Sequence, residues 1–424
     1  MYPTVNDAAN PLRDKGSRLL LQLISLLVCC ALLLTPVCTV DALSDAQQLV
    51  VESWRLVNQA YWDPEGLTEA RWKRQRQKAM EKSIQSSEDA YSAIEVMLSA
   101  LNDPYTRLLR PQDYAALKNS TSGNLSGVGL QLGPDLRADR LVVISTLDGS
   151  PAADADIASG TRLIKVDGQT VDQLGLEGAV RGLRGDVGSQ VVLTLLTQTD
   201  ETREVTLERR SVDLRPVRTR RLRSGSHTFG YLRITQFSEG VPQKVQEALE
   251  ELQTKEIEGL LLDLRNNSGG LVSSGLAVAN DFLSGDAIVE TRNRNGIEDT
   301  IQADSATLYS GPMLTLVNGG TASASEILAG ALQDNGRSTL LGSRTFGKGV
   351  IQTLTNLSDG SGLAVTVAGY VTPSGQNIQG YGIEPDQNLS APEPLNPGGD
   401  GDRWLIEAQQ WMEALLEQES DSSV

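Results

Sequence analysis

The sequence has little of what supports thiol, imidazole or aromatic chemistry, and it has fewer basic than acidic side chains. Of its 424 residues, three are cysteine, one is histidine and 4% are aromatic, while 37 Lys and Arg stand against 54 Asp and Glu, for a formal net charge of −17. Binding to a nucleic-acid backbone needs clustered basic residues, so this balance argues against a nucleic-acid partner. The 39% of hydrophobic residues is enough for globular domains with their own cores.

All three cysteines lie in an N-terminal segment that is typical of an export signal. Basic residues precede a mostly apolar run at 19–34, and small residues at 40–42 offer a cleavage site. We predict a signal peptide over residues 1–42, after whose removal no stable membrane span remains. An uncleaved anchor is the alternative, although the run is slightly shorter than the roughly 20 residues that span a bilayer.

A mature chain that starts at Leu43 contains no cysteine, which excludes disulfides, a catalytic thiol and thiolate metal sites. The single imidazole, His227, precedes an apolar run at 229–232. We interpret it as an exposed residue at the entrance of a strand and not as the base of a Ser-His-Asp triad. We therefore expect no metal and no other cofactor.

The pattern of the mature chain changes twice, which predicts a multidomain protein of the α/β (α+β) class. Apolar residues at helical spacing come first, around a basic helix at 71–82. Short β-like runs separated by Gly, Asp and Pro follow, with one short helix after Ser150, and then strands and helices alternate. The predicted regions are a helical module at 43–118, a β domain at 119–210, an α/β core at 211–400, and a C-terminal helix and tail at 401–424.

The β domain contains the loop Gly127, Val128, Gly129 and Leu130, followed by a Ser-Pro-Ala-Ala helix start and a Lys-Val-Asp-Gly turn at 165–168. In this order the three features resemble a PDZ domain of the type found in exported proteases. The resemblance implies that backbone N–H groups of the glycine loop bind the terminal carboxylate of a peptide, while the adjoining strand edge pairs with the peptide backbone. Glycines that only serve a tight hairpin are the alternative.

The α/β core has a stretch of small residues between a buried strand and a helix, at 317–328, with Ser323 just before the helix. Small residues let a substrate backbone come close, and a helix N-terminus contributes unpaired N–H groups with partial positive charge. A nucleophilic hydroxyl suits this place. Ser323 and Glu326 also match a capping box, so a purely structural cap stays open as the alternative.

A second segment, at 342–352, nearly matches a phosphate-binding loop, but Gly349 replaces the hydroxyl residue that would hold Mg²⁺ and a strand follows. Nucleotide binding is therefore not favoured. Lys348 lies between two glycines and near apolar residues, where desolvation would lower its pKa and let the neutral amine act as a base. Gln352, four residues later, projects to the same side. An ordinary surface lysine is the alternative.

A third segment, at 263–271, combines a strand end, a glycine turn and a helix start. A turn of this kind exposes a backbone N–H. Together with the amide of Ala324 it would supply two donors to a tetrahedral oxyanion.

Taken together, the three segments resemble the C-terminal processing (tail-specific) peptidases, which are serine endopeptidases with a Ser/Lys dyad and an inserted PDZ domain. The shared motifs are Leu-Arg-Asn-Asn-Ser-Gly-Gly, Thr-Ala-Ser-Ala-Ser-Glu-Ile-Leu, Thr-Phe-Gly-Lys-Gly-Val-Ile-Gln and, earlier, Asn-Asp-Pro-Tyr-Thr-Arg at 102–107. The resemblance implies a crotonase- or Clp-protease-like α/β core. It assigns Ser323 as the nucleophile with Ser325 as the main rival, Lys348 as the general base, Gln352 as the residue that orients Lys348, and the backbone amides of Gly269 and Ala324 as oxyanion donors.

Two further implications of the resemblance concern the substrate. Arg184 resembles a PDZ arginine that couples peptide binding to activation in some relatives. The helical module looks closest to the cyanobacterial and chloroplast branch, which trims the C-terminal extension of the photosystem II D1 precursor in the thylakoid lumen. We therefore expect an exported enzyme, in a thylakoid lumen or a periplasm, that holds the C-terminal segment of a protein. A protease of other periplasmic or cell-wall proteins and a non-catalytic PDZ peptide-binding protein are the alternatives.

Overall fold

The computed structural model describes residues 43–119, 124–134, 140–147, 149–197, 199–213, 216–296, 298–394, 397–399 and 401–422. The predicted signal peptide and its three cysteines lie outside these residues. The chain divides after Ser44, and the elements below belong to the unit that begins at Asp45. Within the described ranges, no helix is long and apolar enough to cross a membrane.

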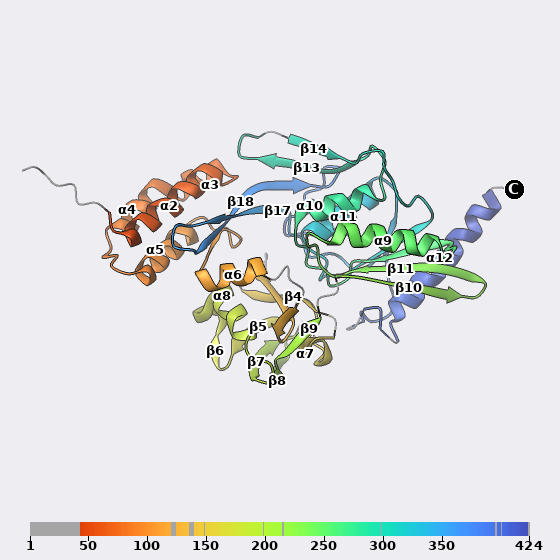
Figure 1. The fold of residues 1–424 in the computed structure, drawn as a ribbon, viewed down its shortest axis with the longest axis horizontal. Helices are drawn as coiled ribbons and strands as arrows, with labels where there is room; N and C mark the ends of the chain where they lie inside the picture. Colours follow the sequence, from red (N-terminus) through yellow and green to blue (C-terminus); the bar gives the residue numbers. More distant parts are fainter. Residues whose placement is uncertain are drawn as a thin grey trace, which may run out of the picture. The chain divides into compact units, whose positions relative to one another are not determined.

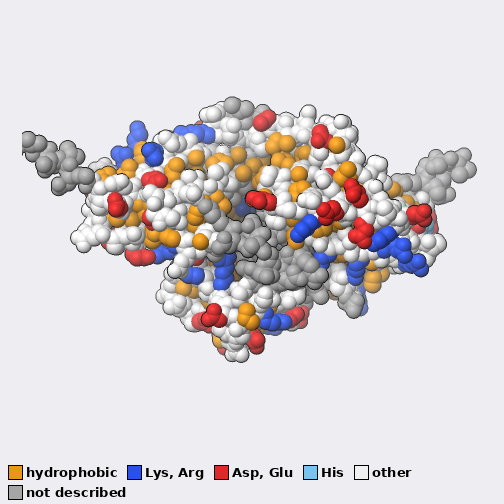
Figure 2. Space-filling view, viewed as in Figure 1, with side chains coloured by type: hydrophobic (Ala, Val, Ile, Leu, Met, Phe, Trp, Pro, Cys, Tyr) orange, Lys and Arg blue, Asp and Glu red, His pale blue; other side chains and the backbone are white. Residues whose placement is uncertain are grey.

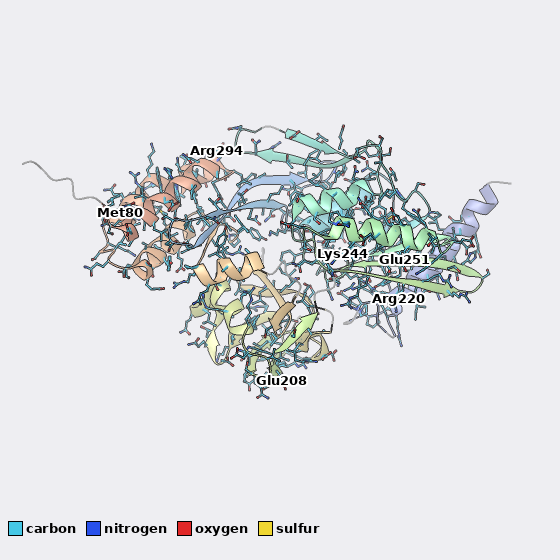
Figure 3. The ribbon with its side chains drawn as sticks, in the orientation of Figure 1. Met80, Glu208, Arg220, Lys244, Glu251 and Arg294 are labelled. Carbon is cyan, nitrogen blue, oxygen red and sulfur yellow. The ribbon has the colours of Figure 1, made fainter. Side chains whose placement is uncertain are left out.

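The N-terminal module is built from four helices (Figure 1), which are α2 (Asp45–Ala60), α3 (Pro64–Glu69), α4 (Trp72–Met80) and α5 (Ser87–Ser99). The side chains of Asp63 and Ser86 accept hydrogen bonds from the first turns of α3 and α5, which explains where these helices begin. The core of the module includes Leu363 from a strand near the other end of the chain. Arg294, labelled in Figure 3, donates to the backbone carbonyl of Asn58 in α2. The module therefore depends on residues of the α/β core.

The PDZ-like domain has a sheet of order β3-β4-β5-β7-β8, in which β3 lies at one edge. Its elements are β2 (Asn124–Gly127), β3 (Leu130–Pro134), β4 (Leu141–Thr146), α7 (Pro151–Asp154), β5 (Arg162–Val166), β6 (Gln169–Thr170), α8 (Val171–Leu183), β7 (Gln190–Leu196), β8 (Thr202–Glu208) and β9 (Arg210–Asp213). The prediction of a single helix in this region was wrong, because α8 follows α7. Gly175 adopts φ 65° inside α8, and such a glycine weakens the helical signal in the sequence.

The core sheet has the order β10-β11-β12-β15-β16-β19. Its strands are β10 (Val217–Ser224), β11 (His227–Ile234), β12 (Gly259–Asp263), β15 (Met313–Val317), β16 (Thr339–Gly342) and β19 (Gln387–Asn388), with α9 (Val241–Gln253), α10 (Val272–Asn280), α11 (Ala324–Asp334) and α12 (Arg403–Ser422) between or after them. All neighbours pair in parallel except β10 and β11. The two faces of this sheet are covered by different helices: residues of α9, α10 and α11 share one apolar core, and residues of α12 share another. Burial on both faces explains the nearly continuous apolar runs of the central strands.

A second sheet joins distant parts of the chain. It contains β1 (Arg107–Leu109), β13 (Ala287–Asn293), β14 (Glu298–Gln302), β17 (Val350–Asn356) and β18 (Gly362–Val371), with β1 paired to β18. The helix α6 (Pro111–Asn119) follows β1. The region predicted as a helical module thus ends in a strand and helix that border the core.

Three loops leave the core sheet at the same end of its strands. They follow β12, β15 and β16, which are adjacent and parallel, so their carboxyl ends meet there. These are the three segments that the sequence singled out, carrying the glycine turn at 268–270, Ser323 and Lys348.

Candidate active site

Ser323 occupies the step from the loop after β15 into α11. Its backbone is in the left-handed region, at φ 58° and ψ −119°, which is costly for a residue with a Cβ and persists only where the surroundings impose it. The side chain is 8% exposed and lines a cleft. This position suits a nucleophile, but Ser323 also takes part in the capping box, because its N–H donates to Glu326, so its catalytic role stays a prediction.

Ser325, the rival nucleophile, faces the protein interior. Its side chain is fully buried, and its hydroxyl donates to the backbone carbonyl of Asn267 at 2.9 Å. This hydroxyl therefore fastens α11 to the glycine turn and does not face the cleft that Ser323 lines.

Lys348 lies in the loop after β16 and is partly buried. Its Nζ is 5.0 Å from the centre of the Tyr105 ring. Burial, followed by the nearby charge of Arg107, lowers the pKa of Lys348 to about 8, although Glu326 acts in the opposite direction. A substantial fraction of this amine is neutral near pH 8, which a general base requires.

Glu326 ties the nucleophile segment to the lysine segment. Its buried carboxylate accepts four hydrogen bonds, from Ser323 N (2.9 Å), Thr345 Oγ1 (2.6 Å), Gly347 N (2.7 Å) and Lys348 N (2.9 Å). Burial raises the pKa of Glu326, and the four donors oppose this by stabilising the charged form. The sequence showed this glutamate only as a capping-box partner. Its full role depends on donors about 20 residues away, which no local pattern reveals.

Tyr370 in β18 makes a second connection between the same two segments. Its buried hydroxyl lies 3.1 Å from the carbonyl oxygen of Ser323 and also contacts the carbonyl oxygen of Lys348. Sequence reasoning did not find this residue. A tyrosine next to a glycine in an apolar strand gives no signal of its own.

The predicted oxyanion donors, Gly269 and Ala324, both lie next to Ser323. Gly269 has φ 96°, and a Cβ at this position would approach Ala322 O to 2.7 Å and Ser323 Cβ to 2.9 Å, so only glycine lets the turn come this close. Ala324 is the first residue of α11, where N–H groups have no partner within the helix. The N–H of Gly269 donates to Asn267 Oδ1 at 3.0 Å, so a bound oxyanion has to share or replace that acceptor.

Gln352 lies in β17 opposite Thr366. Its Nε2 is buried and has no hydrogen-bond partner within the described part of the chain. No hydrogen bond between Gln352 and Lys348 is present among those residues, so its orienting role stays a prediction.

One cleft of about 390 Å³ contains both the predicted catalytic pair and the predicted peptide-binding loop. From the core it is lined by Ser323, Lys348 and the glycine turn, and from the PDZ-like domain by the loop at 127–130, strand β3 and residues of α8 up to Arg184. Gln352 and Ala324 are not among the lining residues. The arrangement can hold an extended peptide between an amide-rich loop and a serine hydroxyl.

A buried ion cluster lies behind the glycine turn. Arg265 donates to Asp263 through Nε (2.9 Å) and to Asp402 at the start of α12 through Nη1 (3.0 Å) and Nη2 (2.7 Å). Burial opposes ionisation of Asp263, yet the charges of Arg265 and Arg233 hold its pKa below the ordinary value. This cluster fixes the end of β12, from which the glycine turn starts.

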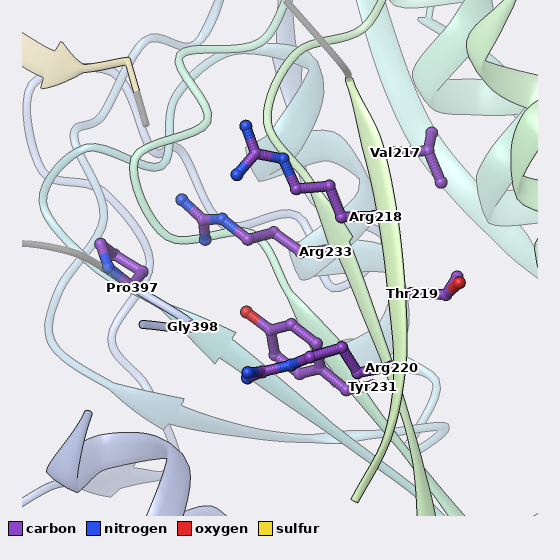
Figure 4. A pocket seen from close by; sticks show the side chains of 8 residues that line it. All are labelled: Val217, Arg218, Thr219, Arg220, Tyr231, Arg233, Pro397 and Gly398. Atoms are coloured by element: carbon purple, nitrogen blue, oxygen red, sulfur yellow. The ribbon is translucent and has the colours of Figure 1, made fainter. Parts of the chain in front are cut away.

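A separate cavity of about 380 Å³ beside β10 and β11 holds none of the predicted site residues (Figure 4). In it Arg220 lies 5.0 Å from the centre of the Tyr231 ring. His227 lies at the start of β11, as predicted, but is half-buried and not exposed, with its Nδ1 hydrogen-bonded to Glu258 Oε2 at 2.7 Å, away from the loops that form the cleft. Among the described residues no cluster of His, Cys, Asp and Glu could hold a metal ion.

Comparison with known proteins shows which families the chain resembles. The PDZ domain family matches residues 116–198, and Peptidase family S41 matches residues 228–389. A carboxyl-terminal-processing protease of Picosynechococcus sp. is 41% identical over 408 residues, covering 96% of this chain and 98% of that protein. A chloroplastic carboxyl-terminal-processing peptidase of Arabidopsis thaliana is 39% identical over 368 residues, covering 83% of this chain and 70% of that protein.

Among solved structures, a photosystem II D1 C-terminal processing protease matches with a TM-score of 0.74 and 37% identity, covering 82% of this chain and 94% of that one. The chain therefore belongs to the carboxyl-terminal-processing proteases of Peptidase family S41, which are serine-type peptidases with a PDZ domain. The predicted family, enzyme class and mixed α/β fold are confirmed.

Proposed function

We propose that this protease cleaves with a dyad of Ser323 and Lys348. The cleft that joins the PDZ loop to both side chains is the observation that carries the proposal. Neutral Lys348 takes the proton of Ser323 Oγ while that oxygen attacks the peptide carbonyl carbon, and the charged amine then returns a proton to the leaving nitrogen. The backbone amides of Gly269 and Ala324 stabilise the oxyanion, and water deprotonated by Lys348 hydrolyses the acyl-enzyme.

The substrate we propose is the C-terminal extension of a photosystem II D1 precursor, removed in the thylakoid lumen. The similarity to a photosystem II D1 C-terminal processing protease of known structure, together with the chloroplastic and cyanobacterial relatives, supports this substrate and compartment. The loop Gly127, Val128, Gly129 and Leu130 would bind the free C-terminus of the substrate, and Arg184 would respond to its arrival. The predicted signal peptide supports export.

The test is mass spectrometry of a D1-type extension peptide after incubation with residues 43–424 of the chain. We expect cleavage at one internal bond, no cleavage by Ser323→Ala or Lys348→Ala, and undiminished binding of the peptide by both variants. Cleavage by the Lys348→Ala variant at the wild-type rate contradicts the dyad. Efficient cleavage of peptides with unrelated C-termini, but not of the D1-type peptide, points to other exported proteins as substrates.

A further inference from the structure

The charges that line the active-site cleft differ from those of the rest of the protein. The described lining residues include three with basic side chains, Arg107, Arg184 and Lys348, and none with a carboxylate. The chain as a whole carries a net charge of −17, and Figure 2 shows acidic and basic side chains spread over the surface. Lys348 is neutral when it acts as a base and Arg107 is paired with Glu177, so the positive charge that can attract an anionic ligand to the cleft comes from the two guanidinium groups.

Two of these side chains have tasks that the proposed function already covers. Lys348 acts as the neutral base. Arg184 follows α8, and its backbone bridges to Gly127, so its charge belongs to the end of the cleft where the terminal carboxylate of the substrate is expected. Arg107 helps to lower the pKa of Lys348 and pairs with Glu177, but the proposed function gives it no contact with the substrate.

Arg107 lies between the PDZ helix and the catalytic lysine. It is in β1, paired with Ala364 of β18, and its Nε donates to Glu177 Oε1 of α8 at 2.6 Å. Its side chain is 33% exposed. Within the described ranges the only hydrogen bond of this side chain is the one from Nε to Glu177, so both Nη groups are available to a ligand. Leu176 and Val180, on the same helix as Glu177, line the cleft.

We propose that Arg107 forms a subsite for an acidic side chain of the substrate tail, located between the scissile bond and the terminal carboxylate. This proposal rests on the proposed function, because it needs a peptide that runs from Ser323 to the PDZ loop. A guanidinium binds a carboxylate through two parallel N–H···O bonds, which gives direction as well as charge. The substrates selected would be proteins whose removable C-terminal segment contains Asp or Glu.

The experiment compares peptides that differ at one tail position only, with Glu, Gln or Lys in turn at each position between the cleaved bond and the C-terminus. For wild-type enzyme we expect one position at which Glu gives about tenfold higher kcat/KM than Gln, mainly through KM, as charge-assisted bonds predict. For Arg107→Gln the ratio falls to about one. For the control Arg110→Gln, an arginine paired with Glu88 and absent from the cleft lining, the tenfold ratio stays.

The ratio of kcat/KM for the Glu and Gln peptides separates substrate recognition from catalysis. Arg107→Gln removes a positive charge near Lys348 and changes the absolute rate, but that effect is common to both peptides and cancels. Arg107→Lys, which keeps the charge and loses the planar fork, is expected to retain only part of the preference. If Arg107→Gln does not fold, this second variant still tests the proposal.

Two results would overturn the proposal: no tail position at which Glu is preferred, or the same preference in Arg107→Gln as in wild type. Binding of the same peptides to the Ser323→Ala protein, measured by fluorescence anisotropy, gives the Glu to Gln affinity ratio without turnover. Absence of cleavage therefore counts against the proposed function, and the affinity ratio then decides about Arg107.

Discussion

Replacing Lys348 by methionine should stabilise the protein while abolishing its activity. The lysine amine is held where burial disfavours its charged form, and its pKa falls from 10.5 to about 8. Methionine has a similar length and no charge, so it removes this cost and removes the base. A catalytic group that destabilises its own fold gives a gain and a loss that can be measured in one variant.

The magnitude follows from the size of the pKa change. Each unit of pKa change is worth about 1.36 kcal/mol, so the fall of the Lys348 pKa to about 8 corresponds to at most about 3 kcal/mol of folding free energy. Because solvent screens the charge of this partly exposed side chain, we expect about 1–3 kcal/mol. Below pH 8 the lysine is protonated in the folded and unfolded states, and the cost is present in full. Between pH 8 and 10.5 the unfolded chain still binds the proton that the folded protein has lost, so wild-type stability rises with pH and the cost disappears.

The assay is urea denaturation of wild type and Lys348→Met at pH 7 and pH 10, with Lys244→Met as the control because Lys244 lies exposed on α9. We expect Lys348→Met to raise the free energy of unfolding by about 1–3 kcal/mol at pH 7 and by much less at pH 10, and the control to change it by under about 0.5 kcal/mol at both. A Lys348→Met protein that is less stable than wild type at pH 7, or a difference that does not shrink with pH, would refute the reasoning.

Three other outcomes are expected. The kcat/KM of the wild type rises about tenfold per pH unit below pH 8 and levels off above it, because only neutral Lys348 is active; a flat profile from pH 6 to 9 contradicts this role. Glu326→Gln leaves two of the four buried donors facing an amide NH₂. We expect this to lower the free energy of unfolding by about 2–4 kcal/mol, measured with heat or urea, and to lower kcat at least about tenfold. An unchanged kcat would show that the carboxylate does not hold the dyad in place. Asp402→Asn removes one of the two carboxylates that pair with fully buried Arg265 and leaves Asp263 shared between Arg265 and Arg233, which should destabilise the protein by about 3–5 kcal/mol in urea unfolding. A double variant with Arg265→Met should recover part of this loss, and no recovery would contradict the explanation.

The sequence predicted those parts of the site that each depend on a short stretch of chain. The glycine turn, Ser323 and Lys348 each follow a buried strand of the core sheet, and adjacent parallel strands bring such loops together. The start of α11 directly after Ser323 was predicted correctly for the same reason, since its apolar and small residues are contiguous.

The remaining parts depend on partners that are distant in the sequence. Tyr370 contacts Ser323 across 47 positions, and Arg107 meets Glu177 across 70. No pattern within a window of a few turns contains such information. Strand β10 shows a related limit, because its sequence is polar and rich in arginine and it forms an edge of the sheet, where only part of it is buried.

The pairing of β1 with β18 has a consequence for dividing this protein into transferable pieces. A fragment cut at the limits of the S41 match, 228–389, would lose the strand that covers β18 and the Asp402 that neutralises Arg265. The unpaired strand edge would favour aggregation, and the buried charge would favour unfolding. The PDZ-like domain is one continuous segment inserted into the peptidase region. The peptidase region can therefore be transferred only as two segments, one before that insertion and one after it.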